Sequence, residues 1–166
     1  MLLVKSAPAA AYYSAAVSNH ASFVKEYLAV LEGSLSEKEG EFRDLLFKDS
    51  AKNKTFVVTR MRKGVKAASL SYRVLEESEG LSLVLVRLHT GRTHQIRVQM
   101  AGISHPVFGD MRYGGALAQK GKLALWAYSL SFLHPITKER LKFIAYPPET
   151  EGAWKLFNIE KAVEIK

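Results

Sequence analysis

The sequence has no cysteine and no long apolar run, and each absence excludes a class of protein. Without cysteine, this chain cannot hold a disulfide framework, a thiolate metal site or a cysteine nucleophile. No segment approaches the roughly 20 apolar residues that a membrane-spanning helix requires. A cytoplasmic protein without a membrane partner is the expectation that fits both absences.

Acidic residues are also scarce. The chain has 16 Asp and Glu against 24 Lys and Arg, which gives a net charge of +8. Such a balance suits a polyanionic partner, most often a nucleic acid. The alternative is a basic surface with no specific partner, and charge alone does not decide between them.

The length of 166 residues, 48% of them hydrophobic, predicts one globular domain over residues 1–166. No repeat, linker or low-complexity segment interrupts it. Many strands joined by hairpins, with a few short helices, indicate an α+β domain. We expect a largely antiparallel, mixed sheet flanked by helices.

Alternating and helical patterns place the elements along the chain. We expect a clear hairpin over residues 66–91, with its turn at "EESEG", residues 76–80. A helix from about His94 to Met100, capped by Thr93 and ended by Gly102, should come after it. The remaining expected strands cover 1–5, 23–32, two segments in 41–60, 123–133 and 139–148, and the remaining helices cover 7–20 and 149–163.

Residues 88–115, "LHTGRTHQIRVQMAGISHPVFGDMRYGG", hold three arginines and a single acid. Arg92 and Thr93 stand at the expected helix entry, where free N–H groups favour anions. Arginine adds forked donors that match phosphate oxygens. The stretch therefore predicts an anion site, most simply for a phosphate backbone, although a solvated cationic face has the same composition. No metal is expected, because its histidines have no cysteine beside them and form no H-x-x-x-H pair.

Several motifs, in order along nearly the whole chain, resemble those of one enzyme family. "TGRTHQIRVQMAGISHPVFGDMRYG" resembles the third motif of the RluA-type pseudouridine synthases, and "VKEYLAVLEG" resembles the tyrosine motif of that family. "ASLSYRVL" and "LALWAYSLSFLHPITKERLKFIAYPP" are similar to its later strands. The resemblance implies a cofactor-free isomerisation of uridine to pseudouridine in ribosomal or transfer RNA.

The resemblance also implies roles for individual residues. Tyr27 would pack on the target base and help to move a proton, and Arg97 would pair with a nucleophilic aspartate. The alternatives are a core tyrosine on a strand and a surface arginine on a helix. The residues that would contact RNA are Lys25, Arg92, Thr93, His94 and Gln95.

The nucleophile itself is missing from its expected place. The family carries it in a His-Arg-Leu-Asp motif, but the three aspartates of this chain, Asp44, Asp49 and Asp110, have other contexts. Because "MLLVKSAPAAA" resembles the strand and helix that come just after that motif in the family, we expect a domain truncated at its N-terminus. Two milder departures are Gln99, where histidine is usual, and Glu26, where threonine is common.

Three interpretations stay open: a fragment of an active synthase, an RNA-binding homologue that lost its acid, and an interaction domain with an incidental basic face. In each case an unpaired, partly buried Arg97 would be costly. We therefore predict that water, an anion or another carboxylate occupies the place beside Arg97. Exposure of a sheet edge near the N-terminus would also favour self-association.

Overall fold

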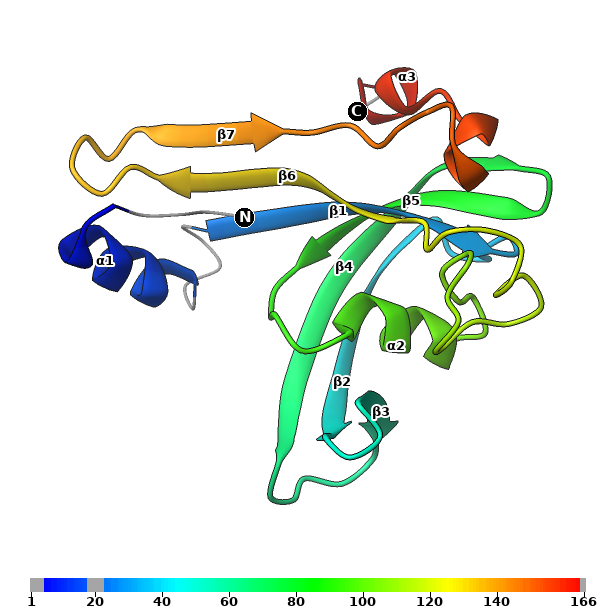
Figure 1. Ribbon diagram of the computed structural model, residues 1–166, viewed down its shortest axis with the longest axis horizontal. Helices are drawn as coiled ribbons and strands as arrows, with labels where there is room; N and C mark the ends of the chain where they lie inside the picture. The colour runs from blue at the N-terminus through cyan, green and yellow to red at the C-terminus, as the bar shows by residue number, and fades with distance from the viewer. Residues whose placement is uncertain (1–4, 18–22, 165–166) are drawn as a thin grey trace.

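The computed structural model describes residues 5–17 and 23–164 of the chain (Figure 1). Seven strands and three α-helices, with one short 3-10 helix, make up this part. The strand expected at residues 1–5 lies almost wholly outside the described residues. The elements are α1 (Ala7–Val17), β1 (Phe23–Glu32), β2 (Glu39–Asp49), β3 (Lys54–Val58), β4 (Val65–Ser78), β5 (Leu81–Leu88), α2 (Gln95–Gly102), β6 (Leu125–Leu133), β7 (Arg140–Ile144), η1 (Gly152–Leu156) and α3 (Ile159–Glu164).

All seven strands form one sheet in the order β3-β2-β4-β5-β1-β6-β7. Each of the six ladders between described strands is antiparallel. The predicted α+β class with a largely antiparallel sheet is confirmed, but "mixed" is wrong for these strands. Short hairpins join β2 to β3, β4 to β5 and β6 to β7, and a hairpin permits only antiparallel pairing.

The predicted central hairpin is formed by β4 and β5, with a tighter turn than expected. The strands continue through Ser78 and Leu81, so that only Glu79 and Gly80 remain in the turn. Both have positive φ, 50° and 73°, as the common two-residue hairpin turns require. A bulge between Val74 and Glu76 absorbs the remaining register difference.

Strand β1 lies at the centre of the core and is covered on both faces. Leu28 and Val30 face one cluster, to which η1 and α3 contribute Trp154 and Ile159. Ala29 and Leu31 face a second cluster, to which α2 contributes Ile96 and Met100. The two layers of apolar contacts hold the middle of the sheet between helices, which fixes where the side chains of β1 point.

A third, smaller cluster covers the far end of β1. Tyr13 of α1 packs edge-on against Phe132, and Phe132 stacks on Phe23. Figure 1 shows α1 and α2 on the same side of the sheet, with η1 and α3 on the other side. The surface of the sheet between α1 and α2 therefore forms the bottom of a concave region of the molecule.

The C-terminal segment departs from the single amphipathic helix that was expected. It forms η1 and α3, separated by Phe157 in an extended conformation with φ −129° and ψ 144°. Asn158 restarts the chain as a helix, because its Oδ1 accepts a hydrogen bond from the backbone N–H of Lys161 at 3.0 Å. The break lets Phe157 and Ile159 both reach the core. None of the described helices is long and apolar enough to cross a lipid bilayer.

Candidate active site

Arg97 lies on α2 and is held by a carboxylate. Its Nε and Nη2 donate to the two carboxylate oxygens of Asp110, at 2.6 Å and 2.5 Å. The Asp110 side chain is wholly buried, and that of Arg97 is 17% exposed. This confirms that another carboxylate occupies the place beside Arg97, and it excludes the alternative of a surface arginine. The geometry is the bidentate one in which a guanidinium binds a carboxylate most strongly.

The surroundings keep this pair ionised. Burial raises the pKa of Asp110, but the hydrogen bonds from Arg97 and from the backbone N–H groups of Tyr113 and Arg112 outweigh it and lower the pKa overall. The hydrogen bond to Asp110 raises the pKa of Arg97 above its usual value. Asp110 therefore has four donors around one buried carboxylate, and the ion pair is a fixed feature of the fold.

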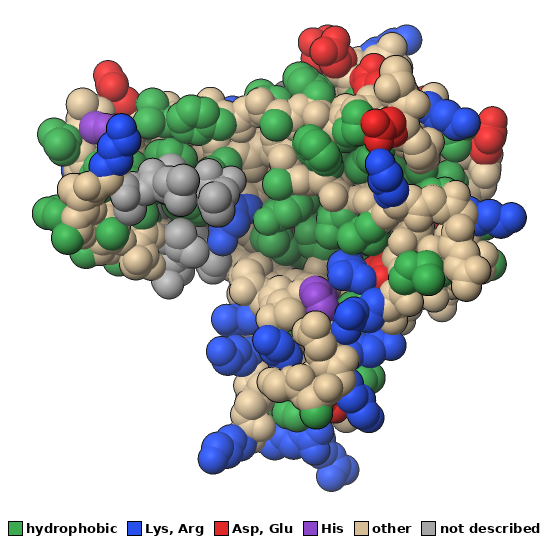
Figure 2. Space-filling model, in the orientation of Figure 1, with side chains coloured by type: hydrophobic (Ala, Val, Ile, Leu, Met, Phe, Trp, Pro, Cys, Tyr) green, Lys and Arg blue, Asp and Glu red, His purple; other side chains and the backbone are tan. Residues whose placement is uncertain are grey.

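Tyr27 and Lys25 lie together on β1 and line a cavity of about 480 Å³ with residues of β6 and β7. Tyr27 also packs against the cluster that holds α2. Burial raises the pKa of Tyr27, so its phenol is protonated at neutral pH. Burial lowers the pKa of Lys25, whose ammonium lies 5.4 Å from the ring centroid of Phe23. Figure 2 shows hydrophobic side chains at the bottom of this concave region and Lys and Arg side chains along its edge.

The start of α2 differs from the expectation. The helix begins at Gln95, one residue after the expected start, and the N-cap residue is His94 in place of Thr93. His94 itself adopts a left-handed conformation, with φ 55° and ψ 23°, and has no side-chain capping bond. Its Nδ1 is instead 3.0 Å from the hydroxyl of Tyr113. A side chain engaged across the loop, rather than a local cap, thus fixes this helix start.

Gln95, which was predicted to contact RNA, has its side chain inside the fold. Gln95 is 2% exposed and makes three hydrogen bonds inside the protein. Oε1 accepts hydrogen bonds from the hydroxyl of Thr90 at 2.8 Å and from the backbone N–H of Arg92 at 3.0 Å, while Nε2 donates to the carbonyl of Ser69 at 3.0 Å. Gln95 shapes the loop that presents Arg92 and Thr93.

A second basic region was not predicted from the sequence. We name it the basic lobe: residues 48–66, from the end of β2 through β3 to the start of β4. It carries seven Lys and Arg residues and one acid, Asp49. Lys48 and Lys66 of the lobe line a small hollow together with the predicted residues Arg92 and Thr93. The excess of cations in this stretch was the available signal.

The histidines of the central stretch all have hydrogen-bond partners in the fold. His89 Nε2 is 3.1 Å from the hydroxyl of Ser71, and His105 Nδ1 donates to the carbonyl of Glu32 at 2.8 Å. Burial, followed by the charges of Arg97 and Arg112, lowers the pKa of His94. Within residues 5–17 and 23–164, no group of three His, Asp or Glu side chains has the arrangement of a metal site.

Known proteins share this fold and these motifs. The sequence profile described as RNA pseudouridylate synthase matches residues 1–102, a segment that includes both Tyr27 and Arg97. Ribosomal large subunit pseudouridine synthase D of Vibrio cholerae serotype O1 is 34% identical over 163 residues, covering 90% of this chain and 49% of that protein. The uncharacterized RNA pseudouridine synthase YjbO of Bacillus subtilis is 36% identical over 127 residues, covering 75% of this chain and 43% of that protein.

A solved structure agrees at the level of the fold. Human RNA Pseudouridylate Synthase Domain Containing 1 superposes with a TM-score of 0.70 at 24% identity, covering 94% of this chain and 70% of that one. The chain belongs to the RNA pseudouridylate synthase family, as an RluA-type member. It spans less than half of the length of the two curated relatives above.

Gln99 and Glu26, the two residues that depart mildly from the family pattern, each contact a charged side chain in the structure. Gln99 is 2% exposed, and its Nε2 donates to Oδ2 of Asp44 at 2.7 Å. Glu26 faces Arg87 of the neighbouring strand, with 3.3 Å between the carboxylate and the guanidinium. Asp44 therefore joins α2 to β2, while both carboxylate oxygens of Asp110 are taken up by Arg97.

Proposed function

We propose that this chain is part of an RNA pseudouridine synthase that isomerises uridine to pseudouridine without a cofactor. The observation that carries the proposal is the family match over residues 1–102, which contains both Tyr27 and Arg97. The reaction needs an aspartate nucleophile that attacks the flipped nucleotide. The glycosidic bond to the base nitrogen breaks, the base turns and reattaches through carbon, and the proton on that carbon leaves while the nitrogen regains one. That aspartate belongs to a motif that residues 1–166 do not contain.

Arg97 is suited to hold such a carboxylate. A guanidinium has five N–H donors, and Asp110 takes two of them, through Nε and Nη2. The remaining donors, on Nη1 and Nη2, have no protein partner among the described residues. A second carboxylate on that edge would be kept ionised by the same cation, since an adjacent positive charge lowers a carboxyl pKa.

Tyr27 is suited to contact the base. Its ring is half-buried at the apolar cavity, and its phenol is protonated because burial raises its pKa. An aromatic face of this kind binds an unstacked base by stacking. Lys25, next to it, would hold the phosphate of the same nucleotide.

The RNA would lie along the basic lobe and the adjoining Arg92, Thr93 and His94, because their surface is cationic where the target strand must pass. Ribosomal RNA is the proposed substrate, since several relatives carry the name ribosomal large subunit pseudouridine synthase D. The reaction on that RNA would take place in the cytoplasm.

The proposal is tested on the protein encoded by the complete reading frame. After incubation with a large-subunit rRNA transcript, pseudouridine is mapped by carbodiimide labelling and primer extension. We expect a modified uridine, no product with Tyr27→Phe or Arg97→Lys, and RNA affinity within a few-fold of wild type for both variants. RNA binding without any product would overturn the proposal and support an RNA-binding homologue that has lost its acid.

A further inference from the structure

The short loop Asp110–Tyr113 is bonded to two separate parts of the molecule. At its first residue, Asp110 holds Arg97 of α2 by two hydrogen bonds. Its last two residues hold the basic lobe. Arg112 Nη1 donates to the backbone carbonyls of Lys52 and Asn53, and the hydroxyl of Tyr113 accepts the backbone N–H of Thr55 at 2.7 Å.

Tyr113 also contacts both parts through its ring. The Arg97 guanidinium lies 5.1 Å from the ring centroid, and the Lys54 ammonium lies 5.2 Å from it. Both distances fall within the range of a cation–π contact. One aromatic ring is thus shared by a cation of the candidate active site and a cation of the basic lobe.

The hydroxyl of Tyr113 is fixed by its two partners. It accepts the backbone N–H of Thr55, and Nδ1 of His94 lies 3.0 Å from the same oxygen. A neutral His94 with its proton on Nε2 would accept the phenol proton at Nδ1. Burial and the charges of Arg97 and Arg112 act in the same direction, because they lower the pKa of His94.

We infer that Tyr113 is a positioning residue which couples the basic lobe to Arg97, so that RNA bound on the lobe shifts the guanidinium and its open edge. The inference rests on the proposed function for the identity of the ligand. A tyrosine with a purely structural role would stabilise the fold, but RNA binding on the lobe would then not change the environment of Arg97.

The test monitors two sites in one RNA titration by NMR: the backbone amide of Thr55 and the Nε–H of Arg97, which is distinct because it donates to Asp110. The probe is a uridine-containing rRNA hairpin. In the wild type we expect both signals to shift with the same midpoint. In Tyr113→Phe, which keeps the ring but loses the hydroxyl, the Thr55 signal should still shift, while the Arg97 response should fall by at least half.

The RNA affinity of Tyr113→Phe should fall by about threefold to tenfold, the effect of losing about one hydrogen bond that pre-orders the lobe. The matched control is Tyr12→Phe, on α1, whose ring also lies beside a cation, Lys138 at 4.8 Å. It should leave both signals and the affinity unchanged. If Tyr113→Phe does not fold, Arg112→Gln removes the other link to the lobe and should reduce the Arg97 response in the same way.

RNA binding and the coupling fail in distinguishable ways. If RNA shifts neither signal in the wild type, the proposed RNA-binding function is wrong. If the Thr55 amide shifts but Arg97 does not, or if Tyr113→Phe retains the full Arg97 response, the coupling is wrong and RNA binding stands.

Discussion

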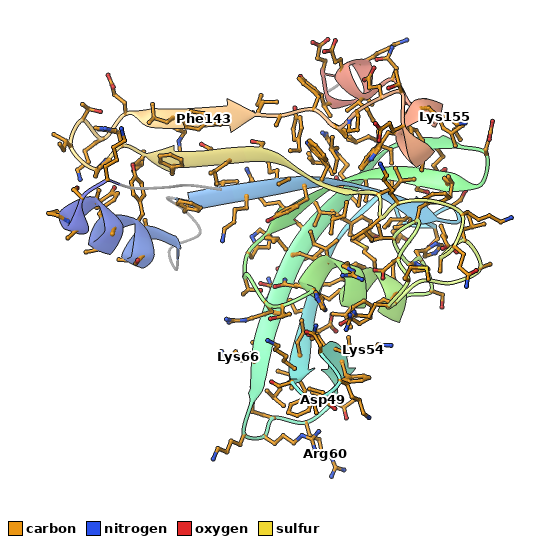
Figure 3. All side chains as sticks on the ribbon, in the orientation of Figure 1. Asp49, Lys54, Arg60, Lys66, Phe143 and Lys155 are labelled. Carbon is orange, nitrogen blue, oxygen red and sulfur yellow. The ribbon has the colours of Figure 1, made fainter. Side chains whose placement is uncertain are left out.

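The two ends of the sheet are built on different principles. The basic lobe exposes cations, and polar contacts from the Asp110–Tyr113 loop hold it in place. The opposite end, at β6 and β7, is held by stacked aromatic rings and leaves Phe143 57% exposed. Figure 3 places Lys54, Arg60 and Lys66 on the lobe and Phe143 on the far strand.

Charge alone does not separate these ends, because the β6–β7 end also carries Lys138, Arg140 and Lys142. What differs is the connection to the site. The lobe is bonded through Tyr113 and Asp110 to Arg97, whereas the cations near β7 have no such path among the described residues. In the proposed function, position relative to Arg97, more than net charge, would therefore define the RNA-binding face.

The largest expected effect comes from removing the carboxylate of Asp110, which anchors the loop that holds the basic lobe. Asp110→Ala would leave the Arg97 charge buried without its partner and two loop N–H groups without an acceptor. Loss of one member of a buried ion pair destabilises by about 3–5 kcal/mol. Urea unfolding followed by circular dichroism measures it. Asp49→Ala, at a partly exposed turn, is the control and should cost at most about 1 kcal/mol. Equal losses for the two variants would contradict the anchoring role of Asp110.

The next effect is on RNA affinity. Replacing Arg60, Arg62 and Lys63 together by Gln removes three cations from the lobe. Each lost phosphate contact reduces the slope of log affinity against log salt by about 0.7, so three contacts give roughly a 100-fold loss at about 0.1 M salt. Fluorescence anisotropy with an rRNA hairpin at several salt concentrations measures both quantities.

The matched variant for this triple change is Lys138→Gln, Arg140→Gln and Lys142→Gln, which lowers the net charge equally at the opposite end. Its affinity should stay within about threefold of the wild type, because only long-range charge is lost and salt screens it. Similar losses for the two triples would mean that net charge, and not the lobe, attracts the RNA.

A smaller effect is expected at the aromatic end. Phe143→Ala should cost less than about 1 kcal/mol of stability, since Phe143 is 57% exposed. Phe132→Ala, at 2% exposure, should cost about 3–5 kcal/mol. Thermal unfolding of both variants compares them. A loss on Phe143→Ala as large as that on Phe132→Ala would contradict the smaller packing role assigned to Phe143.

The smallest effect concerns pH. The pKa of His94 is lowered from its usual 6.5, so the folded state binds fewer protons there than the unfolded chain. Its contribution to stability is therefore present above pH 6.5 and declines as the pH falls through the folded pKa. Titration of the His94 ring by NMR should give a value below 6.5. A value above it would contradict the burial and the neighbouring arginine charges that lower this pKa.

The strands could be predicted because their signal is local. Alternation over β4 and β5, ended by Glu79 and Gly80, is sufficient to define a hairpin, although it does not show how tight the turn is. The start of α2 could not be predicted in the same way, because His94 is positioned by Tyr113, a residue of a later loop. The burial of Gln95 could not be predicted either, because its polar side chain suggests exposure but makes three hydrogen bonds inside the protein.

The candidate site also has residues that the sequence identifies and contacts that only the folded chain determines. The resemblance carried by "KEY" and "HQIR" pointed to Tyr27 and Arg97, and chemistry alone required a partner for a buried arginine. That Asp110 is this partner depends on how the loop after α2 folds back, which no periodic pattern encodes. The basic lobe was visible as a run of cations, but only the sheet brings Lys48 and Lys66 beside Arg92 and Thr93.

The most direct test of the RNA-binding face is photo-crosslinking of the chain to a 4-thiouridine-labelled rRNA hairpin, followed by mass spectrometry of the crosslinked peptides. We predict crosslinks in residues 48–66, at Arg92–His94 and at Tyr27. Crosslinks confined to β6 and β7, or none at a concentration where RNA is bound, would contradict this assignment of the RNA-binding face.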